Sequence, residues 1–243
     1  MYSLYKKSEI SFALFWIAVY CVVMTPIRGR FGDESIYMLL ALVALGAGIS
    51  IFIKRHNLSE KYGLKGFPAD SKRYLYFIPI WFLSTGNLWG GFSPSYAGLS
   101  QVWATLSMVL IGYVEEMIFR GFLFRALLPK DGARKSVVIV AVTFGIGHIV
   151  NMLAGQATVE TVAQVIFAIA WGFMLTIIVY KSGSLLPCIL AHSLVNATSK
   201  YGLDGPGSEW TYIIATIIIA ALYCPYLLKI KGEGSPLSSK SAK

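Results

Sequence analysis

Charged residues are scarce in this chain. Asp, Glu, Lys and Arg make up 14% of its 243 residues, whereas about a quarter of the residues in a soluble domain are charged. Apolar residues make up 56%, and many apolar windows approach or exceed the roughly 17–25 residues that span the hydrocarbon core of a bilayer. This composition excludes a soluble globular enzyme and predicts a polytopic membrane protein. The net charge of +9 then marks cytoplasmic loops and does not indicate nucleic acid as a partner.

Cysteine is equally rare. Cys21, Cys188 and Cys224 all lie in apolar runs, and no Cys-x-x-Cys pair occurs. This excludes zinc-ribbon spacing and a disulfide framework. We expect the three cysteines to be small buried hydrophobic side chains.

Eight apolar runs are bounded by polar residues or by Gly and Pro, and each predicts a helix. We therefore expect an all-α polytopic membrane protein with about eight transmembrane helices. The third run is the least regular, because Pro79 and Gly86 interrupt it. The predicted helices are Ile10–Ile27, Ser35–Ile53, Tyr74–Trp89, Leu99–Leu128, Ser136–Ala154, Glu160–Tyr180, Ser184–Ser199 and Glu209–Ile230.

The basic residues predict an orientation. With the amino terminus inside, the inner segments hold eighteen of the 21 Lys and Arg residues, and the outer ones hold only Arg28, Arg30 and Lys200. Cytoplasmic loops carry the excess of Lys and Arg, so both termini are expected to be cytoplasmic. The polar tail 232–243 is expected to be disordered.

The first group of polar residues inside the apolar runs is Glu115, Glu116 and Arg120. Ionisable groups at membrane depth cost several kcal/mol each unless they are paired or hydrated. Glu116 and Arg120 are four residues apart, so they lie on one helix face and are expected to pair. Glu115 points about 100° away and has no partner in its own helix, which leaves it free for chemistry.

The other two groups carry histidine. His148 lies four residues after Phe144, and His192 and Asn196 lie on one helix face. With a rise of about 1.5 Å per residue and a core about 30 Å thick, Glu115, His148, His192 and Asn196 all fall in one slab in the cytoplasmic half of the membrane. A lone intramembrane histidine often only hydrogen-bonds a neighbouring helix. Three helices that bring polar side chains to one depth instead indicate a site.

Amide hydrolysis fits these residue types. A carboxylate partly screened from water acts as a general base, a histidine beside it orients the water or shuttles its proton, and Asn and His N–H groups donate to an oxyanion. An aspartyl enzyme would need two aspartates in the membrane, but the four aspartates of this chain lie in predicted loops. A serine enzyme would need a Gly-x-Ser-x-Gly type loop, and the nearest candidate, Gly183-Ser184, begins a helix.

In chain order the three groups read Glu-Glu-x-x-x-Arg, Phe-x-x-x-His and His-x-x-x-Asn, on three separate helices. This ordered set resembles the CAAX-protease and bacteriocin-processing family (CPBP, or Abi), whose members are intramembrane endopeptidases related to the CAAX prenyl endopeptidase. No motif residue is substituted, and the resemblance covers about Leu99 to Ser199.

The resemblance implies two sets of residues. The first is catalytic, with a water activated by Glu115 and His148 and an oxyanion stabilised by His192 and Asn196. The second is structural and supporting, and it consists of Glu116, Arg120 and Phe144. On this basis the chain divides into helices of unassigned role (1–97), a catalytic core (98–200), and a last helix with a polar cytoplasmic tail (201–243).

The residues leave the role of a metal open. Glu115, His148 and His192 offer the two imidazoles and the carboxylate that could bind zinc, but the metalloprotease sequence His-Glu-x-x-His is absent because Ile149 follows His148. We favour glutamate catalysis with no cofactor, and zinc is the alternative. The expected partners are the lipid bilayer and a membrane-associated peptide or protein, lipidated or not, at the bacterial cytoplasmic membrane.

Two other classes of function use the same residues. A transporter or proton relay would place Glu and His inside the membrane, but such proteins tend to show repeated halves, and this sequence has no internal repeat. A non-proteolytic immunity or scaffold protein would keep only the fold. Substitution of Glu115 or His148 would favour that interpretation, and both residues are present.

Overall fold

The structure, a computed structural model, describes residues 1–64, 66–203 and 208–230. The tail 232–243 lies outside the described residues. Within the described part, helices dominate, and the one extended pairing is an isolated bridge between Phe92 and Gly202. The predicted all-α class is confirmed.

The helical segments follow the apolar runs of the sequence. In chain order they are α1 (Tyr2–Lys7), α2 (Glu9–Phe31), α3 (Ile36–Arg55), η1 (Ser71–Phe77), α4 (Ile78–Leu83), η2 (Gly86–Leu88), α5 (Gly98–Glu116), η3 (Met117–Leu123), α6 (Phe124–Gly147), η4 (His148–Ala154), α7 (Thr158–Ser182), α8 (Leu186–Thr198) and α9 (Ser208–Lys229).

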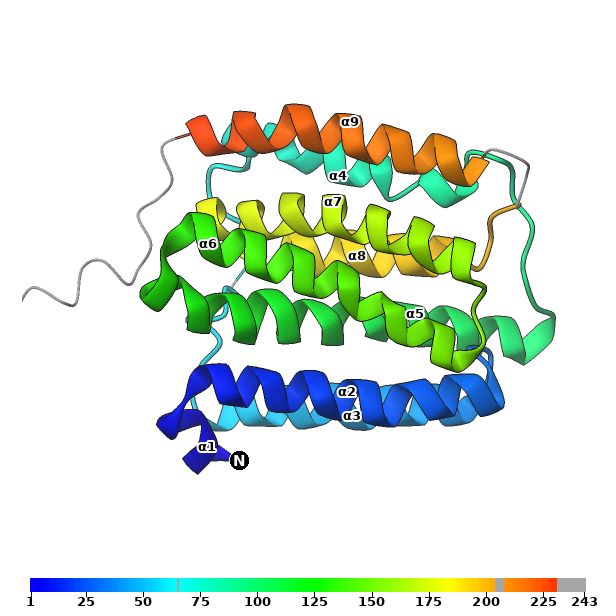
Figure 1. Cartoon of the computed structure of the whole chain (residues 1–243), viewed down its shortest axis with the longest axis horizontal. Coiled ribbons are helices and arrows are strands. Elements are labelled where there is room, and N and C mark those ends of the chain that lie inside the picture. The colour runs from blue at the N-terminus through cyan, green and yellow to red at the C-terminus, as the bar shows by residue number, and fades with distance from the viewer. Residues whose placement is uncertain (65, 204–207, 231–243) are drawn as a thin grey trace, which may run out of the picture.

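Five stretches are long and apolar enough to cross a membrane: Glu9–Phe31, Ile36–Arg55, Gly98–Ala154, Thr158–Ser182 and Ser208–Lys229. The longest of them, 57 residues, bends at Gly132, whose φ of 73° and ψ of 168° interrupt the helix. The chain reverses its direction there, so two antiparallel arms result (Figure 1). These arms correspond to the two predicted helices Leu99–Leu128 and Ser136–Ala154. The total of eight crossings stays a prediction.

The third predicted helix, Tyr74–Trp89, is wrong as one continuous element. It is divided into η1, α4 and η2, with positive φ at Leu75, Tyr76 and Phe77. Pro79 does not break α4 but lies in its first turn, where a missing N–H does no harm. A side chain from α9 pairs with one backbone carbonyl at this break, since the Tyr223 hydroxyl donates to the Tyr74 carbonyl oxygen at 2.7 Å.

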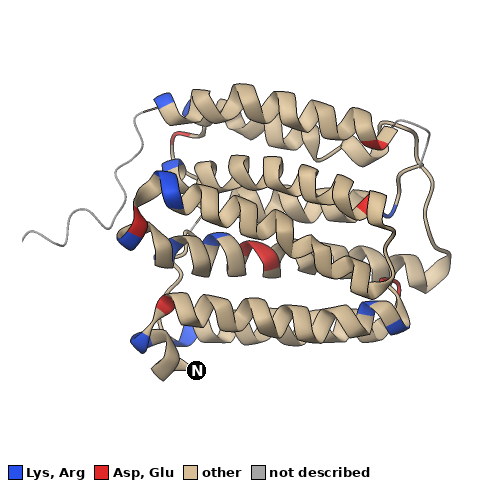
Figure 2. Ribbon diagram, viewed as in Figure 1, with Lys and Arg blue, Asp and Glu red and all other residues tan. Residues whose placement is uncertain are grey.

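The helices lie side by side in layers, with α2 and α3 together at one side and α4 and α9 together at the other (Figure 1). The amino terminus and the end of α9 lie at the same end of this bundle. Lys, Arg, Asp and Glu gather at the two ends of the helices, whereas the middle is nearly free of charge apart from an acidic and a basic stretch around the end of α5 (Figure 2). The bundle therefore has the charge distribution of a multi-pass membrane protein.

A close contact between α5 and α8 positions the polar residues. A Cβ atom on Gly112 would lie 2.5 Å from the backbone nitrogen of Ser193, so only glycine permits this approach. The Ser193 hydroxyl donates to the carbonyl oxygen of Val109 at 2.8 Å across the same contact. Small residues and polar cross-links of this kind join transmembrane helices. His192, the neighbour of Ser193, is thereby held opposite the end of α5.

The substitution Gly112→Ala is expected to destabilise the protein and to lower its activity. The added methyl forces α5 and α8 apart, and overpacking of this kind costs about 1–3 kcal/mol. Thermal unfolding in detergent measures the effect. Gly48→Ala is the matched control, because a Cβ on Gly48 meets only the Trp16 ring at 3.6 Å. Equal melting of the two variants would contradict this account of the contact.

Candidate active site

The two glutamates lie at the point where the regular helix ends. Glu115 and Glu116 close α5, and the chain continues directly into η3, a π-helical stretch that contains Arg120. π-helical turns are rare in proteins, and those that occur often lie at functional sites. The sequence predicted a helix here but not this wider turn.

Glu116 and Arg120 form the ion pair expected from their spacing. Arg120 Nη1 donates to Glu116 Oε1 at 2.8 Å, and both side chains are fully buried. The guanidinium also lies 4.2 Å from the centroid of the Phe144 ring, a cation–π contact. Within the described part of the chain, Glu116 Oε2 and Arg120 Nη2 have no hydrogen-bond partner. The other contacts of the pair are a bond from Arg120 Nε to Thr176 Oγ1 at 3.4 Å and one between Glu116 Oε1 and His192 Nδ1 at 2.8 Å.

Phe144 joins the ion pair to both histidines. Its ring packs edge to face with His148 at 5.0 Å and with His192 at 5.6 Å between centroids. The ring is 2% exposed, so it fills the space between Arg120 and the imidazoles. This contact gives a physical reason for the aromatic residue of the second motif.

His192, on α8, lies between the two glutamates. Its Nδ1 lies 2.8 Å from Glu116 Oε1, and its Nε2 lies 3.6 Å from Glu115 Oε2. A carboxylate oxygen accepts, so Nδ1 carries the hydrogen of the bond to Glu116. The residue is 4% exposed. Of the four candidate catalytic residues, His192 is the one that does not line the cavity described below.

Glu115 has a partner that the sequence did not reveal. The Tyr20 hydroxyl, from α2, donates to Glu115 Oε1 at 2.7 Å. The two residues are 95 positions apart, and a tyrosine in an apolar run is common, so no local signal indicated the contact. The expectation that Glu115 has no partner in its own helix holds, but the carboxylate is not free.

His148 begins η4, directly after α6. Its Nδ1 lies 3.0 Å from the carbonyl oxygen of Phe144, which can only accept, so Nδ1 carries a hydrogen. In the neutral ring this bond leaves Nε2 as an acceptor.

A cavity of about 920 Å³ brings three of the candidate residues together. Glu115, His148 and Asn196 line it, together with residues of α2, α5, α7 and α9. Glu116, Arg120 and His192 lie outside its wall. The carboxylate, the imidazole and the carboxamide therefore face one common space, supported from behind by the buried ion pair.

The cavity extends to the end of the helices where Arg28, Asp33 and Lys200 meet. Asp33 accepts from Arg28 Nε at 2.7 Å and from Lys200 Nζ at 2.8 Å, and Arg28 Nη1 donates to Asn151 at 3.1 Å. Burial disfavours the charged form of Asp33, but the two cations outweigh this effect and hold the pKa of the carboxyl below its ordinary value. This network ties the end of α2 to η4 and to the end of α8. Arg28 and Lys200 belong to the end that the charge asymmetry assigns to the outside.

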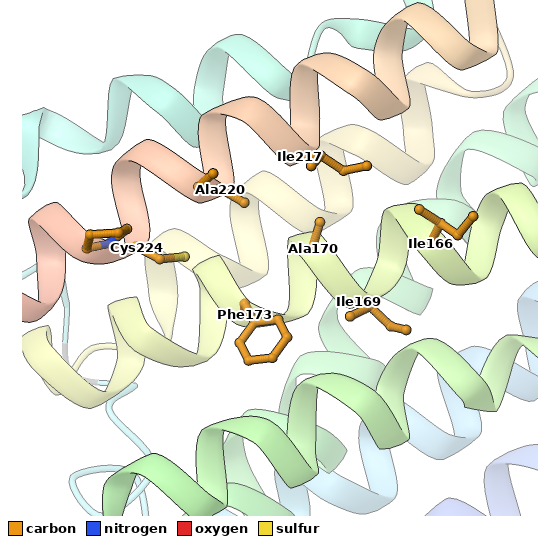
Figure 3. A pocket seen from close by; sticks show the side chains of 9 residues that line it. Ile166, Ile169, Ala170, Phe173, Ile217, Ala220 and Cys224 are labelled. Carbon is orange, nitrogen blue, oxygen red and sulfur yellow. The ribbon is translucent and has the colours of Figure 1, made fainter.

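A second hollow lies between α7 and α9 (Figure 3). It measures about 500 Å³ and is lined by apolar side chains and one thiol. The lining residues are Ile166, Ile169, Ala170, Phe173, Ile217, Ala220, Ala221, Cys224 and Pro225. None of the candidate residues faces it, and the Cys224 thiol is the one titratable group in its lining.

No three His, Cys, Asp or Glu side chains are arranged to hold one metal ion among the residues that the structure describes. Glu115, His148 and His192, the predicted ligands if a metal were used, do not form such a group.

The cavity lies between apolar helices and carries a carboxylate, an imidazole and a carboxamide on its wall. Residues 98–198 match the family model described as "type II CAAX prenyl endopeptidase Rce1-like". The predicted resemblance is confirmed over this segment, and the match supports a CAAX-type intramembrane protease in general. No curated protein matches the chain.

The matched segment runs from the first residue of α5 to the last residue of α8. All seven motif residues lie inside it, from Glu115 to Asn196. Helix α2, with Tyr20 and Arg28, lies outside it.

Proposed function

We propose that this protein is an intramembrane endopeptidase that hydrolyses a peptide bond with a water activated by Glu115 and His148. The observation that carries the proposal is the shared cavity. Glu115, His148 and Asn196 come from three helices, yet all three line one space inside an apolar bundle. The match of residues 98–198 to a family of prenyl endopeptidases supports the same reaction.

The proton transfers follow from the tautomers and contacts. Glu115 takes a proton from the water while the oxygen of the water forms a bond to the peptide carbonyl carbon. Glu115 then passes this proton to the leaving amine as the C–N bond breaks. His148, with Nδ1–H held by the Phe144 carbonyl, presents Nε2 as an acceptor that orients the water. General acid–base catalysis of this kind contributes about 10²–10⁴ in rate.

Asn196 is the oxyanion donor in this proposal. Its side chain lines the cavity, and the carboxamide offers the N–H donors that stabilise a tetrahedral intermediate. His192 was expected to share this role, but its Nε2 lies next to Glu115 Oε2 and its ring is behind the wall. We assign to His192 a supporting role, because the bond between its Nδ1 and Glu116 Oε1 holds the ring next to Glu115.

The substrate in this proposal is a membrane-associated peptide or protein at the bacterial cytoplasmic membrane. Candidates are a prenylated protein, a bacteriocin leader, a sorting signal or a membrane-anchored peptide. The test is a comparison of the membrane peptides in cells that carry the wild-type protein and in cells that carry Glu115→Gln. Fragments present only with the wild type support an endopeptidase. Identical fragment sets combined with a changed proton or solute flux would favour the transporter instead.

Chelation separates the glutamate mechanism from the zinc mechanism. If Glu115 and His148 act unaided, exhaustive chelation is expected to leave activity intact, and the purified protein is expected to contain substoichiometric zinc. His148→Ala should then lose water activation, whereas His192→Ala should lose only a supporting contact and keep more of the turnover. Elemental analysis with activity before and after chelation measures this. One zinc per chain whose removal stops turnover and whose return restores it would contradict the metal-free proposal.

A further inference from the structure

We propose that Tyr20 is a positioning residue of the active site, contributed by a helix outside the segment that matches the family model. Its phenol fixes the Glu115 carboxylate in the orientation that faces the cavity. This inference rests on the proposed function, because it assigns to Tyr20 a task in the reaction of Glu115.

The Glu115 carboxylate has one side-chain hydrogen bond within the described part of the chain. The Tyr20 hydroxyl donates to Oε1 at 2.7 Å from α2, whereas His192 Nε2 lies 3.6 Å from Oε2, too far for a hydrogen bond. Glu115 is only 9% exposed, and the part that is exposed lines the cavity. The Tyr20 bond therefore fixes the orientation of the carboxylate and leaves Oε2 for a water.

One face of α2 forms the wall opposite α5. Ile17, Tyr20, Cys21, Met24 and Arg28 line the cavity, and their spacing of three, four and seven residues is that of one helix face. Tyr20 is the residue on this face whose hydroxyl reaches the candidate base. Its contact is thus part of a continuous surface and not an isolated side-chain encounter.

Helix α2 is anchored on both sides of Tyr20, so the phenol has a fixed position. Before it in the chain, Phe12 packs on the Phe122 ring of η3 at 5.0 Å between centroids, and Trp16 lies 6.3 Å from the same ring. After it, Arg28 is bonded to Asp33 and Asn151. A group held within a few tenths of an ångström by packing and hydrogen bonds on both sides can preorganise its partner.

A purely structural tyrosine would behave differently from a positioning one. A structural hydroxyl satisfies a buried carboxylate, so its loss lowers stability alone. A positioning hydroxyl also changes the chemical step. Without the phenol O–H the carboxylate is free to turn away from the water, so kcat falls even for the protein that remains folded.

The test is Tyr20→Phe in the intact chain, assayed for kcat and KM with the concentration of folded protein measured beside them. We expect kcat to fall about 10- to 100-fold, the range for a lost hydrogen bond to a charged group, with KM little changed. Both constants refer to the folded protein, so a lower yield alone does not produce this split between kcat and KM.

Tyr113→Phe is the matched control. Tyr113 lies on the same helix as Glu115, and its hydroxyl is bonded to Ser50 of α3 at 2.7 Å, away from the cavity. It is expected to keep the wild-type kcat and KM. If Tyr20→Phe also keeps both, or if its kcat rises, Tyr20 does not position the base. An active Glu115→Gln variant would instead overturn the proposed function itself, whatever Tyr20→Phe shows.

Discussion

Glu115→Gln is expected to abolish proteolysis while the protein stays folded. The amide has nearly the same size and still accepts a hydrogen bond from Tyr20, so the contacts of the side chain persist. It cannot take a proton from water. Loss of one general base lowers the rate by about 10²–10⁴, and here no second carboxylate faces the cavity at that point, since Glu116 is buried behind it.

The measurement is turnover of a membrane peptide by purified protein, together with its thermal unfolding. Glu9→Gln is the control, because Glu9 pairs with Lys61 at the start of α2 and does not line the cavity. Near-normal turnover by Glu115→Gln would remove the basis of the mechanism. A loss of turnover accompanied by unfolding would show that Glu115 is a structural residue.

Arg120→Ala is expected to lower the stability of the protein as well as its activity. The change leaves the Glu116 carboxylate fully buried with His192 as its one remaining hydrogen-bond partner in the described part of the chain. Removal of one member of a buried ion pair costs about 3–5 kcal/mol. Phe144 also loses the cation that lies 4.2 Å from its ring, so the support of both histidines weakens.

Yield and melting temperature in detergent measure this effect, and Arg30→Ala is the control because Arg30 is exposed at the end of α2. The control should melt with the wild type. If Arg120→Ala also melts with the wild type and loses only its activity, Arg120 acts on the substrate directly and its structural assignment is wrong.

Local signals in the sequence predicted the helices and the ion pair. Apolar runs of sufficient length predict helices in a membrane, because a single helix satisfies all of its backbone hydrogen bonds without water or a neighbouring strand. The pair Glu116–Arg120 followed from helix geometry alone. In both cases the residues that determine the feature lie within one helix-length segment of the sequence.

Long-range and rotational features escaped prediction. The contact of Tyr20 with Glu115 joins residues 95 positions apart, and nothing near Tyr20 marks it. The place of His192 behind the wall depends on how α8 is rotated about its axis, and an apolar helix in an apolar bundle carries little pattern that fixes its rotation. The breaks at Leu75 and Tyr76 were missed because neither residue is a usual turn former.

The depth of the polar residues, estimated from the sequence, does not indicate where the cavity opens. Rise per residue placed the polar groups in the cytoplasmic half, but the cavity continues to the helix ends that carry Arg28 and Lys200. The charge asymmetry assigns that end to the outside. An opening cannot be located from single-helix depths, because it depends on which helices leave space between them.

The Glu116–Arg120 pair also matters during synthesis, before α8 has been made, because it neutralises the Glu116 carboxylate at membrane insertion. Glu116 precedes His192 by 76 residues, which at about 5–20 residues per second corresponds to about 4–15 s of translation. During this interval α5 enters the membrane without α8. Arg120, only one helical turn away in the same segment, already neutralises the carboxylate at insertion. Glu115 meets His192 only when α8 arrives, so the proposed active site is incomplete until α8 has been made.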